Sequence, residues 1–448
     1  MNKTLYGLRR SPQHWFNTLS KYFREIGLRP TSHDSCLFVG TPVPGKAHIY
    51  VALFVDDFVY FSPDSAVEQY FEETLASKVK VDFMGQVDYF LGILFDWKRH
   101  DDGSVSVHLS QEAYANQIVE SMGLSDSVSS PTMTPYRSGL PIDCIPPVDM
   151  SDSERAPLLT LYRRFLGMLN WLTISTRPDL MTVHSLLAIA TTKPTQGHLD
   201  AIRYVGRYIK ATADYGISFS SNANDSLESF LTFPLDDSIP NVLKPTAFTD
   251  SNWGPQDASV PTYKTSRQVS LNETQSISGH LVFLSGGPLI WKSQKEKRTS
   301  RSSCEAEVKA TDDCTKSVQW LRNILEDLDL LPPRPTPIFN DNQAAVIWSN
   351  SSSTKGMRHY NVRENAVREA INEYKEVTVQ HIGGKVNPAD LFTKEHKSDE
   401  TFRNLRDSFM SRRSSGGCWY DRTPCTRASH SRVTFSPESD RPVSAGCY

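Results

Sequence analysis

Apolar side chains near the N-terminus recur with the period of an α-helix. Ser11 suits the N-cap, Pro12 the first helical turn and Gly27 the position just after the last turn. The apolar residues between these limits share one helical face: Trp15, Phe16, Leu19, Phe23 and Ile26. The pattern therefore predicts an amphipathic helix over residues 11–27.

The next pattern is typical of a β-hairpin. The run IYVALFVDDFVYF, which starts at Ile49, is dense in aromatic and β-branched residues, and these favour strands. Two adjacent carboxylates, Asp56 and Asp57, interrupt the run, and because buried unpaired charge is costly they belong in a turn. Taken alone, this hairpin over residues 48–62 fits either an ordinary acidic turn or a turn that presents oxygen ligands to a divalent cation.

Polar breaks separate the remaining elements of the first half of the chain. In chain order, we expect a charged helix at 65–78, an apolar strand at 89–97, an amphipathic helix at 110–124 and several helices within 158–214. Residues 128–157 are rich in Ser, Pro and Asp, which is typical of a linker, and residues 220–240 form another polar break.

Strands and helices alternate in the second half of the chain. The pattern predicts strands at 245–253, 280–293 and 377–382, a short strand that ends at Asp341, and helices at 303–328, 342–350 and 358–373. The order, β-β-β-α-β-α-α-β-α with a last helix that begins at Asp390, indicates an α/β fold. After about residue 397 the composition turns to Ser, Arg, Gly and Pro, so we expect a disordered tail.

Composition narrows the class of protein. The chain has 448 residues, which is enough for two to four domains. Its hydrophobic content is 38%. No apolar run has the length that spans a bilayer, so no membrane partner is expected. The seven cysteines include no C-x-x-C pair, which argues against a zinc ribbon or a disulfide framework and fits a reducing compartment.

Four carboxylates of the second half stand where an α/β fold gathers a site. Asp250 and Asp341 end strands, Glu307 lies near the start of the long helix and Asp390 begins the last helix. If they converge, their mutual repulsion favours a bound cation, and a pair of Mg²⁺ ions would activate a water for in-line attack on a phosphodiester. Singly, each is more often a helix cap or a solvated loop residue, so the ordered set is the stronger signal.

Nine blocks of the sequence, in order between about residues 4 and 396, resemble the C-terminal Pol region of copia-type LTR retrotransposons. The blocks are LYGLRRSPQHWF, LFVDDFVYF, YFLGILF, YRRFLGMLNWLTISTRPDL, TDSNWG, SISGHLVFLSGGPLIWKSQKEKRTSRSSCEAE, DNQAAV, RHYNVRE and NPADLFTK. A lone Asp-Asp hairpin is weak evidence for this family, whereas nine ordered blocks are strong evidence.

The resemblance implies a reverse transcriptase palm and thumb in the first part. Asp56 and Asp57 match the aspartates that bind catalytic Mg²⁺. The segment with Arg9 and Arg10 matches one that packs against template and incoming nucleotide. The YFLGILF strand, with Leu91 and Gly92, matches the strand that grips the primer end.

The resemblance implies a ribonuclease H domain in the second part, with two Mg²⁺ ions held by Asp250, Glu307, Asp341 and Asp390. Glu307 fits the family pattern better than Glu305. His381 matches either a histidine that assists product release or an ordinary strand-end residue. Basic residues are expected to contact the phosphates of an RNA–DNA hybrid or a primer–template duplex, although each also fits a solvated connection: Lys292, Lys295, Lys297, Arg298, Arg301, Arg358 and His359.

The chain departs from the family in three places. The family's fingers and a third polymerase carboxylate precede the LYGL block, which here starts at Leu5, so we expect the polymerase half to be inactive as an isolated chain. Those upstream Pol segments are either on a separate chain or lost from a decayed element. The nuclease part has a longer connection between Trp253 and Ser278, and Cys304 and Val308 replace family residues that are not metal ligands.

These patterns lead to one domain scheme and three readings of function. We expect a partial palm and thumb at 1–128, a linker and helical connection at 129–240, a ribonuclease H-like domain at 241–396 and a disordered tail at 397–448. The first reading is Mg²⁺-dependent hydrolysis of RNA in RNA–DNA hybrids, and the second is a silent nucleic-acid-binding remnant. An unrelated phosphatase or nuclease leaves the other blocks unexplained. We expect the protein to be located either in cytoplasmic particles or in the nucleus.

Overall fold

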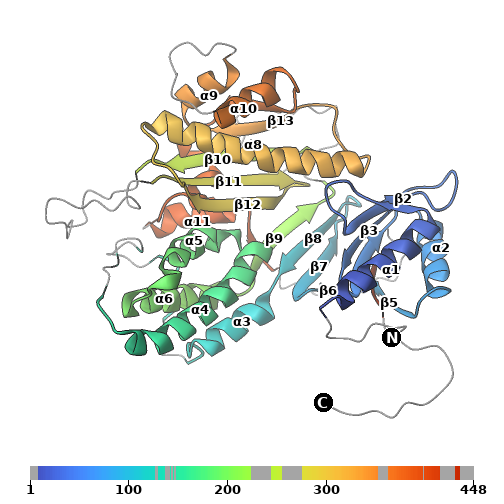
Figure 1. Ribbon diagram of the computed structural model, residues 1–448, viewed down its shortest axis with the longest axis horizontal. Helices are drawn as coiled ribbons and strands as arrows, with labels where there is room; N and C mark the ends of the chain where they lie inside the picture. The colour runs from blue at the N-terminus through green and yellow to red at the C-terminus, as the bar shows by residue number, and fades with distance from the viewer. Residues whose placement is uncertain are drawn as a thin grey trace. The chain divides into compact units, whose positions relative to one another are not determined.

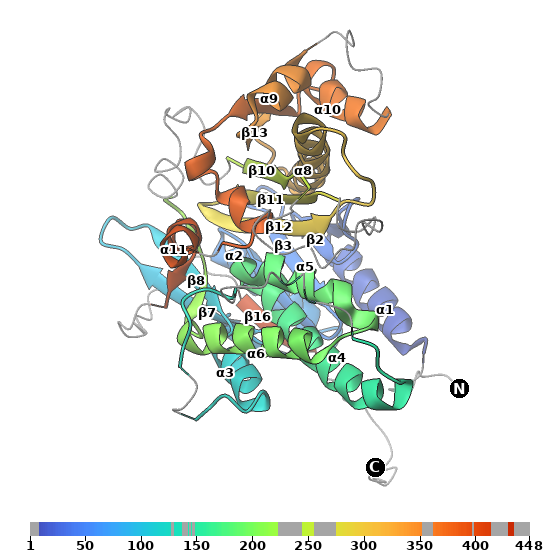
Figure 2. The ribbon, with the colours of Figure 1, turned by 90° about the vertical axis from the view of Figure 1, so that its left-hand side faces the viewer.

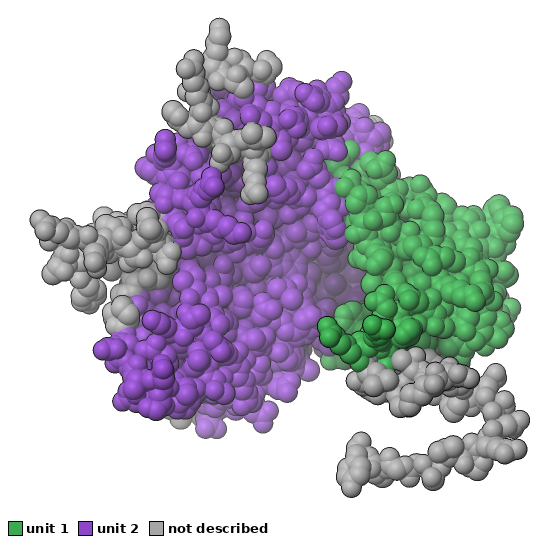
Figure 3. Space-filling view, viewed as in Figure 1, with its two compact units in different colours: residues 1–90, 322–331, 420–448 green, residues 91–321, 332–419 purple. Residues whose placement is uncertain are grey.

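The computed structural model describes residues 9–126, 130–136, 142, 145, 148–222, 244–254, 275–351, 362–396, 398–413 and 429–433. Mixed sheets and helices confirm the α/β class. The chain divides into two compact units (Figure 3). Unit 1 comprises residues 1–90, 322–331 and 420–448, and unit 2 comprises residues 91–321 and 332–419. The expected helical connection and ribonuclease H-like region therefore fall in one unit.

Unit 1 contains a β-sheet with helices packed against it. The sheet has the strand order β1-β2-β3-β4-β16-β5. Its elements are β1 (Leu28–Pro30), β2 (Leu37–Gly40), β3 (Ile49–Phe54), β4 (Asp57–Phe61), β5 (Val81–Gln86) and β16 (Ser429–Val433), covered by helices α1 (Ser11–Ile26) and α2 (Ser65–Ala76). The rings of Phe23, Phe38, Phe58 and Phe71 pack at edge or tilted angles in the core. The predicted helix and hairpin are confirmed, except that Arg10, not Ser11, is the N-cap of α1.

A turn interrupts the strand predicted at 89–97. β6 (Tyr89–Phe90) ends before Leu91 and Gly92, whose φ angles are 50° and 78°, and β7 (Ile93–Arg99) starts after them. Glycine adopts such angles freely, and the apolar run gives no sign of the turn apart from this one residue. β7 pairs antiparallel with β8 (Val105–Ser110), β8 with β9 (Tyr215–Ser220), and β9 with β15 (Ser411–Arg412).

The predicted helical connection, residues 129–240, contains α4 (Asp152–Ser175), α5 (Met181–Ile189) and α6 (Gln196–Ala211), with short 3-10 turns at Pro178–Leu180 and Ala190–Thr192. Helix α3 (Glu112–Ser121) precedes it in the chain. The core of the connection holds a buried ion pair, in which Arg177 donates to both carboxylate oxygens of Asp179 at 2.9 and 2.7 Å. The hydroxyl of Tyr208 donates to Asp179 at 2.6 Å. These bonds satisfy charges that would otherwise be costly to bury.

The region predicted to be ribonuclease H-like contains a five-stranded sheet of order β12-β11-β10-β13-β14. Its strands are β10 (Thr246–Asn252), β11 (Ile277–Leu284), β12 (Gly287–Lys295), β13 (Thr336–Asn340) and β14 (Val377–His381). Its helices are α8 (Ser303–Asp327), α9 (Gln343–Asn350) and α10 (Val362–Asn372), with 3-10 turns η6 (Gly384–Val386) and η7 (Pro388–Phe392). β10, β11 and β12 are antiparallel, whereas β13 and β14 run parallel to β10. The predicted order of elements is confirmed, although Asp390 lies in η7 and not in an α-helix.

Helices cover both faces of this sheet. Figures 1 and 2 show α8 on one face of β11 and β12, and α5 on the other. The connection is tied to the sheet by hydrogen bonds from Trp291 Nε1 to the Thr173 carbonyl and from the Ser185 hydroxyl to the Ser293 carbonyl, both at 3.0 Å. Apolar residues of α3 to α6 and of β10 and β11 share one buried cluster. The connection and the sheet therefore have a common core.

The prediction of a disordered tail is wrong for residues 398–413 and 429–433. Helix α11 (Asp399–Asp407) buries Phe402 completely, and Arg406 is only 2% exposed. β15 extends the β9 edge, and β16 pairs antiparallel with both β4 and β5. The average composition of the tail is polar, but an amphipathic helix and strand pairing depend on a few positions and on distant partners.

None of the helices in the described part of the chain is long and apolar enough to cross a membrane.

Candidate metal centre

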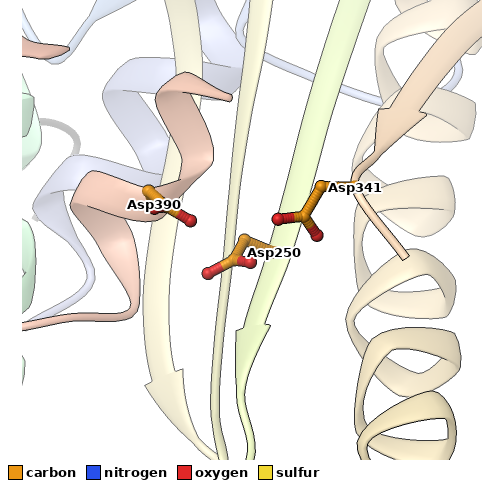
Figure 4. Close-up of side chains that lie close together, drawn as sticks. All are labelled: Asp250, Asp341 and Asp390. Atoms are coloured by element: carbon orange, nitrogen blue, oxygen red, sulfur yellow. The ribbon is translucent and has the colours of Figure 1, made fainter. Parts of the chain in front are cut away.

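Three aspartates converge near the carboxyl ends of β10 and β13. Asp250 lies on β10, Asp341 directly follows β13 and Asp390 lies in η7. Each offers a carboxylate oxygen, and these oxygens lie within 4.8 Å of one another (Figure 4). Within the described residues, no other group of three or more potential metal ligands was found.

The parallel pairing of β10 and β13 explains why Asp250 and Asp341 meet. Thr249 pairs with Asn340, so the two aspartates occupy the next position on each strand. The carboxyl ends of neighbouring parallel strands reach the same sheet edge, which is where sites of α/β folds form. The strand-end pattern in the sequence thus located both side chains correctly.

A glycine lets the third aspartate approach. Gly279 on β11 pairs with Asp250, and a Cβ atom at Gly279 would lie 2.5 Å from the Cβ of Phe392. Real Cβ atoms do not approach so closely, so a side chain at this position would displace η7. The absence of a side chain allows η7 to cross β11 and brings Asp390 to Asp250.

Glu307 lies beside the aspartates but outside the group of three. Its side chain is buried on α8 and accepts a hydrogen bond from Asn340 Nδ2 at 3.1 Å. Burial, reinforced by the charges of Asp250 and Asp341, raises the pKa of Glu307 to about 9. Glu305 turns elsewhere, because it bonds the Lys309 ammonium at 2.8 Å and the Arg301 amide at 2.8 Å.

The aspartates repel one another in the absence of a divalent cation. Burial and the charge of Asp250 raise the pKa of Asp341, and they raise that of Asp390 to about 7. Lys394 partly compensates, with its Nζ 2.6 Å from Asp390 and 3.4 Å from Asp250. Carboxylate oxygens are the ligands that hard divalent cations prefer, and a bound cation would neutralise the repulsion, so these residues fit Mg²⁺.

Sequence reasoning missed several side chains of this site. Lys394, Asn340 and the hydroxyl of Thr393, which bonds Asp250, were not predicted. His396 Nε2 also lies 3.1 Å from the Asp390 carbonyl. The i,i+4 spacing of Asp390 and Lys394 could have indicated an ion pair, whereas nothing local marks Asn340. His381 is exposed, 3.1 Å from the Asp341 carbonyl, which leaves both of its readings open.

The Asp-Asp hairpin lies in unit 1. Phe54 pairs with Asp57 across the turn, and Val55 has a φ of 57°, a conformation that costs energy for a β-branched residue. Trp15 Nε1 on α1 donates to the Val55 carbonyl at 2.7 Å and so holds the turn. Asp56 and Asp57 are half-buried, and no third carboxylate joins them among the described residues.

The predicted nucleic-acid contacts are mostly on the surface. Arg9 and Arg10 are exposed ahead of α1, and Leu91 and Gly92 form the turn between β6 and β7. On β12 and its connection to α8, Lys292, Lys297, Arg298 and Arg301 are exposed, while Lys295 is half-buried. Arg358 and His359 lie outside the described residues.

The chain is similar in sequence to known reverse transcriptase and transposon proteins. Residues 1–137 match the family model described as reverse transcriptase (RNA-dependent DNA polymerase). The chain is 27% identical to the Retrovirus-related Pol polyprotein from transposon RE2 of Arabidopsis thaliana, over 88% of this chain and 24% of that protein. Transposon RE1 of Arabidopsis thaliana and transposon TNT 1-94 of Nicotiana tabacum give similar matches, at 26% and 23% identity, and confirm that the chain resembles the Pol polyproteins of copia-type transposons. It spans about a quarter of the length of these relatives.

Solved structures were also compared. LC11-RNase H1, isolated from compost, is 14% identical and aligns with 34% of this chain and 92% of its own, with a TM-score of 0.25. The foamy viral protease-reverse transcriptase in complex with RNA/DNA hybrid is 11% identical and aligns with 88% of this chain and 40% of its own, with a TM-score of 0.39.

Proposed function

We propose that unit 2 hydrolyses the RNA strand of RNA–DNA hybrids in a Mg²⁺-dependent reaction. The observation behind this proposal is the convergence of Asp250, Asp341 and Asp390, with buried Glu307 beside them. These residues come from four separate segments of the chain. Helix caps and solvated loop residues have no reason to converge in this way. Similarity to transposon Pol proteins supports a nucleic acid as the substrate.

The three aspartates would hold the divalent cation, and Glu307 would complete the ligand set once it loses its proton. The chemistry that Mg²⁺ would supply there is a lower pKa for a coordinated water and neutralisation of charge on the phosphate. Asn340 orients the Glu307 carboxyl through its hydrogen bond at 3.1 Å. Gly279 keeps η7 close enough for Asp390 to take part.

Basic side chains beside the site would hold the hybrid. Lys297, Arg298 and Arg301 are exposed on the connection that leads into the Glu307 helix. Trp253, three residues after Asp250, donates its indole N–H to the Ser300 carbonyl at 2.9 Å and so fixes this connection to the end of β10. Phosphate contacts of this kind would make binding weaken steeply as salt increases.

Unit 1 contributes an incomplete polymerase site in this proposal. Asp56 and Asp57 would bind Mg²⁺, but the described residues bring no third carboxylate to the hairpin. We therefore expect no primer extension by this chain alone. Extension of a primer on an RNA template by the purified chain, lost in Asp57→Asn, would contradict that expectation.

The test of the nuclease is cleavage of a labelled RNA–DNA hybrid by the purified chain in Mg²⁺ or EDTA. Asp341→Asn should abolish cleavage, because it removes the charge of one metal ligand. It should retain hybrid binding, because the position is partly exposed and the substitution leaves the fold intact. Glu305→Gln is the matched control, since Glu305 bonds Lys309 on the same helix and should leave cleavage intact. Hybrid binding without cleavage in folded wild-type protein would favour the silent remnant instead.

A further inference from the structure

The ammonium of Lys394 lies among the carboxylates that form the candidate metal centre. Its Nζ is 2.6 Å from Asp390 Oδ1 and 3.4 Å from Asp250 Oδ2. We propose that Lys394 is an internal cation that holds Asp250 and Asp390 together in the metal-free protein and competes with the divalent ion for them. This inference deepens the proposed function and rests on its metal site.

The position of the ammonium supports competition with a metal ion. Two of the three clustered aspartates are within ion-pair distance of Lys394 Nζ. A divalent cation bound by the same oxygens would meet a positive charge at short range, where repulsion is strong. The side chain of Lys394 is 38% exposed, so its flexible stem can carry the ammonium into solvent when the metal enters.

Other bonds already hold the segment that bears Asp390. Thr182 Oγ1 donates to the Leu391 carbonyl at 2.7 Å, and Asn252 Nδ2 donates to the Thr393 carbonyl at 3.3 Å. Asn387 Nδ2 donates to the Thr249 carbonyl at 3.0 Å. These bonds do not involve the ammonium, so η7 does not need Lys394 to hold it in place. The geometry therefore supports charge compensation as the role of Lys394.

Two substitutions separate charge from shape. Lys394→Met keeps an unbranched apolar stem and removes the charge, so the two carboxylates lose their internal partner. We expect the metal-free protein to unfold at a lower temperature and to bind Mg²⁺ about tenfold more tightly, a modest gain because the ammonium is partly solvated. Lys394→Arg retains the charge and should bind Mg²⁺ no more tightly than the wild type.

The experiment is calorimetric titration of the EDTA-treated full chain with Mg²⁺, without nucleic acid, together with thermal unfolding in EDTA. Lys316→Met is the control, because Lys316 also pairs with a buried aspartate four positions away, Asp312, but this pair is not part of the group of clustered aspartates. Tighter Mg²⁺ binding by Lys394→Met alone supports the proposal. Equal or weaker binding by Lys394→Met, or no binding by any of these chains, overturns it.

Hybrid cleavage, measured on the same preparations, separates this inference from the proposed function. Wild-type cleavage with unchanged Mg²⁺ affinity in Lys394→Met would leave the nuclease standing and remove the role of Lys394. Tighter Mg²⁺ binding by Lys394→Met without hybrid cleavage by the wild type would support the role of Lys394 and contradict the proposed nuclease.

Discussion

Replacing Glu307 by glutamine should stabilise the metal-free protein, although it removes a proposed catalytic carboxylate. The isostere keeps an oxygen that can accept the Asn340 hydrogen bond, and it has no proton to take up on folding beside Asp250 and Asp341. The stabilisation comes from the proton that folding forces onto Glu307. Its size therefore depends on pH.

The magnitude follows from the pKa of Glu307, which folding raises from 4.5 to about 9. A group whose pKa is raised on folding stabilises the native state fully below its unfolded pKa, and this contribution is lost as pH rises through the folded value. At pH 7 the unfolded chain has long released the proton, and one pH unit corresponds to about 1.4 kcal/mol. Keeping the proton on Glu307 in the folded state therefore costs about 3 kcal/mol at pH 7 as an upper estimate.

Urea unfolding in EDTA at pH 4.5, 7 and 8 would test this reasoning. Glu307→Gln should gain up to about 3 kcal/mol at pH 7, more at pH 8 and almost nothing at pH 4.5. Glu305→Gln is the control, because the Lys309 pair lowers the pKa of Glu305 against the effect of burial, and its loss should cost up to about 1 kcal/mol. A gain in Glu307→Gln that is equal at all three pH values, or no gain at pH 8, would refute the argument.

Three further substitutions test other contacts. Gly279→Ala should push η7 away from β11, weaken Mg²⁺ binding and destabilise the protein by about 1–3 kcal/mol; unchanged calorimetry and unfolding would show that η7 does not need the glycine. Asn340→Asp replaces the amide donor to Glu307 by a carboxylate, so the pH at which Mg²⁺ binds should rise; an unchanged pH profile of binding would exclude this positioning role. Arg406→Met removes hydrogen bonds to the hydroxyls of Tyr208 and Tyr215 and should cost about 2–3 kcal/mol in urea unfolding, whereas a neutral result would mean that α11 adds little to the core.

Local sequence patterns were sufficient for most elements and for the positions of the carboxylates. The hairpin with Asp56 and Asp57 and the long helix with Glu307 follow from apolar periodicity and turn residues, which act within a few positions of the chain. Asp250 and Asp341 were predicted from strand-end patterns; Asp341 directly follows β13, whereas β10 continues two residues beyond Asp250. The turn at Leu91 and Gly92 and the 3-10 form of η7 were missed, since each depends on backbone angles at one or two residues.

The sequence by itself determined the longer helices and the strands next to the candidate carboxylates, and it marked four carboxylates as a set. Only the tertiary structure decided that Lys394 enters the group, that Asn340 orients Glu307 and that Gly279 makes room for Asp390. It also decided that Phe402, Leu405, Phe409 and Met410 of the tail belong to the core of unit 2. The physical reason is that periodicity reports on neighbours in the chain, whereas charge compensation, close approach and strand pairing depend on residues far apart in sequence whose proximity exists only after folding.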